Sequence, residues 1–210
     1  SSATEKEKAD LESALQTEPI HAYQKIYSKS IEKDFKEKAG LQTITIMVTS
    51  REDFKPFIAL QENGQEVPVT DGVVVSQKLA QLADVKVGDE LELDGKEIKV
   101  AAISENYVGH FVYLNRATYE QVYGTSPKEN TYLVKLKEPT PSNTEKEAAA
   151  FMKKAAVSGV VQNATAIHLF ESVASSLNKT MAILVLVSVL LAIVILYNLT
   201  NINVAERIRE

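Results

Sequence analysis

The stretch that decides the fold is MAILVLVSVLLAIVILYNLTNINVAERIRE, residues 181–210. Between Met181 and Tyr197 the only polar residue is Ser188. This run, extended by Leu199, approaches the roughly 20 residues that a helix needs to cross a hydrocarbon core of about 30 Å. It is apolar on every side, so a soluble fold would have to surround it with core on all faces. The sequence therefore predicts a transmembrane helix. Its predicted membrane residues are Met181, Ile183, Leu184, Leu186, Leu190, Leu191, Ile193, Ile195 and Tyr197.

Both flanks of this run suit a membrane crossing. Tyr197 lies where an interfacial aromatic residue is expected, and Arg207 and Arg209 follow it, with acidic residues beside them. On the other side, FESVASSLNKT (170–180) leads into the run without proline or glycine. We therefore expect one helix, starting near Phe170, that leaves the membrane and enters an exterior domain. The alternative is a buried hairpin or central helix in a soluble fold.

Composition excludes several classes of protein. The 210 residues allow one moderate domain or two small ones. A net charge of −5, with lysines mixed among acidic residues, argues against a nucleic-acid-binding protein. The absence of cysteine excludes a thiolate metal site and a cysteine nucleophile. The N-terminal SSATEKEKADLESALQ lacks the apolar region of a signal peptide.

The remaining chain alternates helical and strand-like patterns. Apolar residues spaced by three and four predict helices over 3–16 and 20–38, with Gly40 as the C-cap of the second. A strand over 41–49 and a hairpin over 56–70, turning at Asn63-Gly64, follow. Beyond Asp71 we expect a strand, a helix at 76–83, strands at 89–93, 96–104 and 110–114, a helix at 116–123 capped by Asn115, a strand at 130–138, a helix from Ser142 and a strand at 159–167. Asp94-Gly95 is the expected tight turn between two of these strands.

Two segments together resemble a known family. The first is GVVVSQKLAQLADVKVGDELELDGKEIKVAAI (72–103), which contains Ser76-Gln77-Lys78-Leu79-Ala80 and then Val87-Gly88-Asp89. The second is Glu206-Arg207-Ile208-Arg209-Glu210 directly after the apolar span. This combination resembles the FtsX-like, MacB-like permease family of ABC transporters, and the resemblance covers most of the chain.

The resemblance implies an α+β fold with a two-lobed exterior domain on a C-terminal stalk. We expect an N-terminal helical segment (1–19), a discontinuous porter-like α+β lobe (20–68 and 126–168), an inserted β-rich lobe (69–125), and a stalk with the transmembrane helix and a cytoplasmic end (169–210). Residues 1 to about 178 are expected outside the cell. The family's first membrane helix is absent from residues 1–20, so we expect the chain to be a fragment.

The resemblance also implies a function and partners. The chain is expected to be a non-catalytic permease subunit in the cell membrane that couples ATP hydrolysis by a cytoplasmic ABC ATPase subunit to movement of its exterior domain. Export of a peptide, lipid or similar amphiphile follows from the family, as do contact with membrane lipid, an extracellular adaptor, and a dimer or pseudo-dimer of permease halves. Glu206, Arg207, Arg209 and Glu210 are the expected ATPase-coupling residues. Two alternatives stay open: a signalling permease that regulates a cell-wall hydrolase, and a soluble binding module with an apolar dimerisation helix.

The sequence predicts no catalytic, cofactor-binding or metal-binding residue. His21, His110 and His168 lack the spacing of metal ligands, and no phosphate-binding glycine motif occurs, so ATP is expected to bind a partner. For Ser76 we favour an N-cap over a nucleophile. Two further sets of residues each allow two interpretations. The acidic set, in which we favour a solvated strand face over a calcium site, is Asp89, Glu90, Glu92 and Asp94. The aromatic set is Tyr107, Phe111, Tyr113, Tyr119 and Tyr123. We favour packing of these residues in the core; the alternative is a partner or substrate surface at Tyr107, Phe111 and Tyr113.

Overall fold

The computed structural model describes residues 3–36, 38–51, 53–106 and 109–207, and of 163–172 and 202–207 it describes the backbone alone. The chain divides into two units. One comprises residues 12–137, and the other comprises residues 1–11 with 138–210. The boundary falls inside α1 (Glu5–Leu15), a helix that confirms the prediction for residues 3–16.

The unit of residues 12–137 is built on one seven-stranded sheet. Its order is β6-β7-β5-β8-β2-β1-β9. The strands are β1 (Ile20–Asp34), β2 (Leu41–Thr49), β5 (Val73–Ser76), β6 (Glu90–Leu93), β7 (Lys96–Ser104), β8 (Phe111–Asn115) and β9 (Thr131–Leu136), with β3 (Gln61–Glu62) and β4 (Gln65–Glu66) as a separate hairpin. The helices α2 (Gln77–Ala83) and α3 (Arg116–Tyr123) lie where the sequence predicted them.

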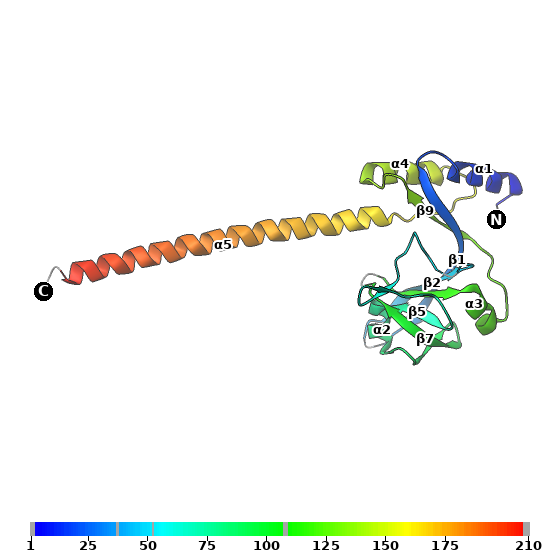
Figure 1. Ribbon diagram of the computed structural model, residues 1–210, viewed down its shortest axis with the longest axis horizontal. Coiled ribbons are helices and arrows are strands. Elements are labelled where there is room, and N and C mark those ends of the chain that lie inside the picture. Colours follow the sequence, from blue (N-terminus) through cyan, green and yellow to red (C-terminus); the bar gives the residue numbers. More distant parts are fainter. Residues whose placement is uncertain (1–2, 37, 52, 107–108, 208–210) are drawn as a thin grey trace. The chain divides into compact units, whose positions relative to one another are not determined.

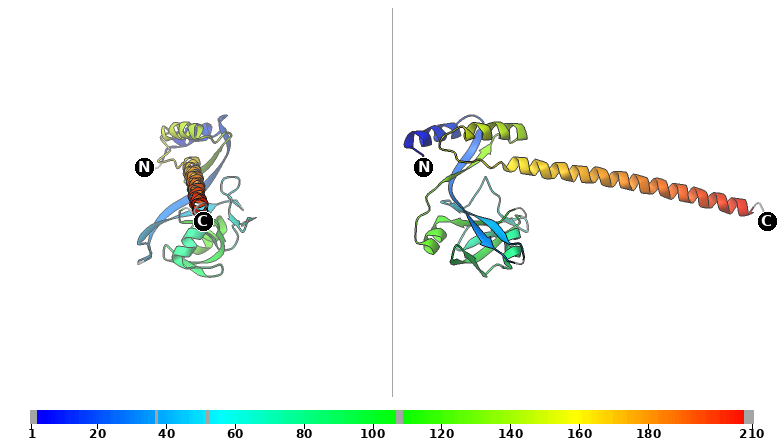
Figure 2. Two further views of the ribbon diagram at one scale, coloured as in Figure 1. Left: turned by 90° about the vertical axis from the view of Figure 1, so that its left-hand side faces the viewer. Right: turned by 180° about the vertical axis from the view of Figure 1, so that it is seen from behind.

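The predicted helix over 20–38 is wrong, because residues 20–34 form the long strand β1 (Figure 2). The first half of β1 pairs with β9 and buries the even-numbered Gln24 and Ile26. The second half pairs with β2, and there the odd-numbered Tyr27 and Ile31 pack against the core. This change of inward parity spaces the apolar residues by three and four, which imitates a helix. Gly40, at φ +62°, lies in the turn from β1 to β2 and caps no helix.

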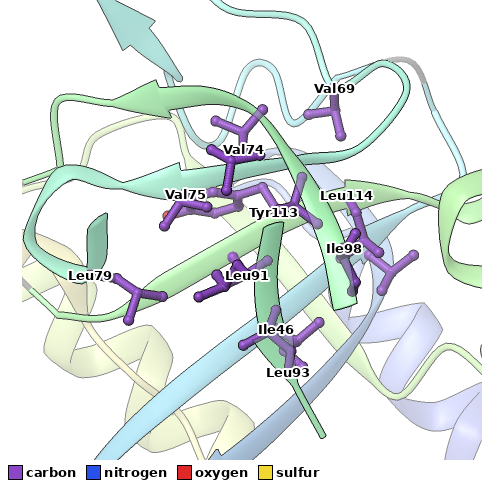
Figure 3. Close-up of a cluster of buried hydrophobic side chains, with 14 of the residues drawn as sticks. Ile46, Val69, Val74, Val75, Leu79, Leu91, Leu93, Ile98, Tyr113 and Leu114 are labelled. Atoms are coloured by element: carbon purple, nitrogen blue, oxygen red, sulfur yellow. The ribbon is translucent and has the colours of Figure 1, made fainter. Parts of the chain in front are cut away.

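The core of this unit is one continuous hydrophobic cluster (Figure 3). β5 is central and covered on both faces, so its three valines are fully buried, as is typical of an interior strand. Leu79 of α2 and the inward residues of β6, β7 and β8 complete the packing. Asp94-Gly95 and Asn63-Gly64 both adopt positive φ, as a two-residue hairpin turn requires, and so confirm the two predicted turns.

The segment expected to form an inserted lobe, 69–125, contributes β5 to β8 to the same sheet. β8 pairs in parallel with β2, and the hydrophobic cluster runs through both stretches. The sheet also curls. Lys29 and Lys33 of β1 form ion pairs with Asp94 and Glu92 at the end of β6, although four strands separate β1 from β6 in the sheet order. The lobe boundaries at residues 69 and 125 stay a prediction.

The second unit contains α4 (Pro141–Met152) and α5 (Asn163–Arg207) (Figure 1). Thr140 caps α4, since its Oγ1 accepts a hydrogen bond from the Asn143 N–H at 3.2 Å. The strand predicted for 159–167 is wrong, because α5 already begins at Asn163, and no proline or glycine interrupts it from there on. The chain is thus an α+β protein with a long apolar C-terminal helix, as predicted.

Candidate functional site: a membrane-spanning helix and the surfaces beside it

The apolar part of α5 is long enough to cross a membrane and is not covered by the described chain. Within Val173–Asn201 the most apolar stretch of 18 residues has a mean hydropathy of 2.9, and none of it is buried. At 1.5 Å per residue the whole segment Val173–Asn201 is about 43 Å long, against a hydrocarbon core of about 30 Å. All nine predicted membrane residues lie within it with their side chains exposed. The structure therefore does not show the buried central helix of the soluble alternative.

Three hydroxyl groups of this segment bond to main-chain carbonyls within the helix. Thr180 donates to the Ser176 carbonyl at 3.0 Å, Ser188 to Leu184 at 2.8 Å, and Thr200 to Leu196 at 2.8 Å. In hydrocarbon an unpaired hydroxyl costs several kcal/mol, so bonds to the preceding turn make these residues compatible with lipid. Ser188, the one polar residue of the central run, therefore does not count against a membrane crossing.

The ends of the span carry the predicted flanking residues. Lys179 and Tyr197 are exposed on α5. The helix backbone continues through Glu206 and Arg207, whose side chains lie outside the described part, and Arg209 and Glu210 lie outside it altogether. The coupling role of these four residues stays a prediction.

The aromatic residues of β8 and α3 pack mostly inward. Tyr113 is only 2% exposed, meets Phe54 edge-on with ring centroids 5.4 Å apart, and accepts a hydrogen bond from Asn106 Nδ2 at 3.0 Å. Burial raises the pKa of its phenol to about 12. Phe111 stacks on Tyr113 and is half-buried, while Tyr107 lies outside the described residues. Tyr113 thus belongs to the core, the interpretation that the sequence favoured.

Ser76 does not cap α2 with its side chain, contrary to expectation. The residue is fully buried, and its Oγ accepts a hydrogen bond from the Phe111 N–H at 3.0 Å and donates to the Gly109 carbonyl at 3.3 Å. It therefore joins the end of β5 to the start of β8. This contact spans more than thirty residues of sequence, which is why local pattern could not reveal it.

The acidic residues near the β6–β7 turn are exposed, and two of them pair with lysines. The hydrogen bond from Lys33, and then that from the Gly95 N–H, lower the pKa of Glu92. Asp94 pairs with Lys29, and Asp89 accepts a hydrogen bond from the Lys86 N–H. The two ion pairs, of Lys29 with Asp94 and of Lys33 with Glu92, join β1 to the turn, whereas the Asp89 contact is local.

The histidines do not converge. His21 and His110 line different clefts, and the side chain of His168 is outside the described part. Burial, and then the nearby Lys78, lower the pKa of His110. Within the ranges that the structure describes, no three His, Cys, Asp or Glu side chains are grouped so as to hold a metal ion.

Two clefts of the 12–137 unit were not predicted from the sequence. One, of about 350 Å³, lies between the start of β1 and the loop after β2. It is lined by Leu15, Gln16, Thr17, Ile20, His21, Ala22, Tyr23, Arg51, Pro56 and Phe57. The other, of about 360 Å³, has a basic lining that includes Lys38, Lys78 and His110. The isoleucine and tyrosine residues of 20–38 are typical of a strand, and this composition is the signal that could have located the first cleft.

Comparison with known proteins gives matches among solved structures only. No protein-family model and no curated protein matches the chain. The chain is similar to the extracellular domain of the noncanonical ABC-type transporter YknZ from Gram-positive bacteria, at 13% identity and a TM-score of 0.40 over 70% of this chain and 79% of that one. It is also similar to the periplasmic region of MacB from Actinobacillus actinomycetemcomitans, at 14% identity and a TM-score of 0.38 over 70% and 75%.

Proposed function

We propose that this chain is the exterior domain and one membrane helix of an ABC transporter permease subunit of the FtsX/MacB type. The observation that carries the proposal is α5, a single helix of 45 residues with an exposed apolar segment long enough to span a bilayer. The segments 72–103 and 206–210 supply the family resemblance. Such a subunit hydrolyses no ATP itself and works with a cytoplasmic ABC ATPase subunit.

The continuity of α5 suits it to transmit movement. No proline or glycine occurs between Asn163 and Arg207, so main-chain hydrogen bonding is uninterrupted across the span. A displacement of the cytoplasmic end is therefore carried along the helix axis instead of being lost at a kink. In this proposal residues 1 to about 178 lie outside the cell, and the stalk moves the exterior domain to export a peptide, lipid or similar amphiphile, with an extracellular adaptor and a second permease half as partners.

The charged end of α5 is the proposed contact with the ATPase. Positions 206 and 210 are four residues apart and so share one helix face, while 207 and 209 lie nearer its flanks. Arginine can hold a partner carboxylate with two parallel hydrogen bonds, which fixes orientation as well as position. Anionic headgroups would also attract these arginines, but that attraction requires only positive charge.

Lysine substitutions distinguish contact of the arginines with the ATPase from their attraction to anionic headgroups. We expect the Arg207→Lys, Arg209→Lys double variant of the full permease, reconstituted with its ATPase, to lower coupled ATPase activity roughly tenfold while membrane insertion stays unchanged, since lysine keeps the charge but lacks the guanidinium fork. The measurement is ATPase rate with and without permease in lipid vesicles.

A matched control is Lys179→Arg, a charge-preserving exchange at the other end of the span, which should leave coupling unchanged. If the double lysine variant keeps normal assembly and normal coupled ATPase activity, the arginines only anchor the helix and the proposed transmission through them is wrong.

A further inference from the structure

The first half of β1 has one strand edge without a partner strand. Residues from Ile20 to Ile26 pair with β9 on one side. On the other side, pairing with β2 begins only at Tyr27, which lies opposite Val48. Among the residues that the structure describes, no strand lies along the second edge of Ile20–Ile26.

The peptide groups that face this open edge can be assigned from their neighbours. Along a strand, successive residues direct their N–H and C=O to opposite sides. The Asn130 N–H donates to the Ile26 carbonyl at 3.0 Å, so even-numbered residues of β1 face β9. The Phe35 N–H donates to the Gly40 carbonyl at 3.0 Å on the β2 side, as expected for odd-numbered residues. Tyr23 and Lys25 therefore direct their main-chain groups toward the open edge.

A turn at the end of β2 keeps this edge open. Thr49 Oγ1 accepts hydrogen bonds from the Arg51 N–H at 3.0 Å and from Gln24 Nε2 at 2.7 Å, and donates to the Asp53 carbonyl at 3.4 Å. These bonds fold the chain after Thr49 away from β1 and hold the turn to β1 through Gln24. The cleft of about 350 Å³ that results has residues 20–23 of β1 on one wall and Arg51, Pro56 and Phe57 on the other.

We propose that this cleft binds an extended acidic segment of a partner protein, which adds to β1 as a strand. Alternating N–H and C=O groups at an open edge are matched by an extended main chain. Among the residues that the structure describes, the lining includes the guanidinium of Arg51 and no aspartate or glutamate, so its charge is complementary to a carboxylate. Leu15, Ile20 and Phe57 provide apolar contact for neighbouring side chains of the segment. The site uses no residue of the membrane span, so it stands whether or not α5 couples to an ATPase.

Amide hydrogen exchange in the full chain in detergent tests the proposal. The probe is a short synthetic peptide of alternating valine and threonine with one central glutamate. In the free chain we expect the Tyr23 and Lys25 amides to exchange faster than those of Gln24 and Ile26, which face β9. Saturating peptide should slow exchange at Tyr23 and Lys25 at least about tenfold, because each gains a main-chain partner.

Two matched peptides test the two interactions separately: the carboxylate bond to Arg51 and the main-chain pairing with β1. A peptide with glutamine in place of glutamate should bind roughly fivefold more weakly, because it loses the charge-assisted bond to Arg51. A peptide methylated on alternate amide nitrogens should give no protection, since it cannot pair with the strand edge. On the protein side, Arg51→Gln should reproduce the roughly fivefold loss, whereas Lys55→Gln, next to the cleft but not in its lining, should not.

Tyr23→Pro should abolish the protection at Lys25, and proline is tolerated where the N–H faces away from the paired strand. Should this variant fail to fold, the methylated peptide tests the same bond without altering the protein. Absence of protection by the acidic peptide, or equal protection by the methylated one, overturns the proposal. Protection of Tyr23 without peptide, appearing as the chain self-associates, would assign the edge to a second copy and would equally overturn it.

Discussion

At the scale of single residues, two polar side chains at strand ends had similar predicted roles and turned out differently. Asn115 caps α3 as predicted, with its Oδ1 accepting the Thr118 N–H at 2.7 Å. Its Nδ2 also donates to the carbonyls of Val69 and Thr70 at 3.1 and 3.3 Å, which sequence could not show. Ser76 was predicted to cap α2 but instead bonds across to β8. Local spacing predicts a cap only where no distant donor takes the capping oxygen itself, as the Phe111 N–H does at Ser76.

Substitutions at Asn115 distinguish its cap on α3 from its bonds to the Val69 and Thr70 carbonyls. Asn115→Ala should lower the free energy of unfolding by about 2 kcal/mol, since it removes the cap and the Nδ2 donor to the Val69 and Thr70 carbonyls, of which the Thr70 carbonyl still accepts from Thr118 Oγ1. Asn115→Ser keeps a capping oxygen and should cost about 1 kcal/mol. Urea unfolding of the chain in detergent, followed by tyrosine circular dichroism, measures both. Equal stability of the alanine variant and the parent chain would contradict the capping role.

At the scale of elements, sequence predicted most of the strands and helices because their patterns are local. The turns at Asn63-Gly64 and Asp94-Gly95 and the buried β5 follow from short-range chemistry. β1 was misread because its inward face changes parity midway, between the part paired with β9 and the part paired with β2. Tertiary partners determine that change, and they also form the cleft at the open edge of β1, so a local pattern predicts neither feature. The exposed apolar segment of α5, in contrast, could be predicted from composition alone.

The ion pair between Lys33 of β1 and Glu92 of β6 gives a pH-dependent prediction. Lys33→Met keeps the aliphatic stem and should cost no more than about 1 kcal/mol at neutral pH, because the Glu92 side chain is 52% exposed and water screens the pair. The folded pKa of Glu92 lies below its ordinary 4.5, so this stabilisation is present above 4.5 and is lost as pH falls through the folded value. The difference between parent and variant in urea unfolding should therefore vanish in acid. Lys135→Met, on exposed β9, is the control and should show no such pH dependence; an acid-independent cost for Lys33→Met would assign the effect to packing.

At the scale of the whole molecule, the proposal requires that α5 cross the bilayer with the folded unit outside. The chain has no cysteine, so a single introduced cysteine reports its own side of the membrane. In intact cells we expect a membrane-impermeant thiol reagent to label Ser142→Cys, in α4, and to label Glu210→Cys only after the membrane is opened. The apolar length of α5 and the arginines after it are the physical reasons.

A charge in the middle of the span tests whether hydrophobicity drives this arrangement. Leu190→Arg places a guanidinium near the centre of the apolar run, which costs about 3 kcal/mol for an inserting helix. Val173→Arg, at the edge of the same segment, lies near the interface, where a long basic side chain can reach headgroups at little cost. We therefore expect Leu190→Arg, but not Val173→Arg, to make Glu210→Cys reactive in intact cells or to release the chain on alkaline extraction. A chain that is soluble without detergent would contradict the membrane crossing, and a soluble dimer would favour the module in which α5 is an apolar dimerisation helix. Labelling at position 210 and not at 142 would indicate the opposite orientation.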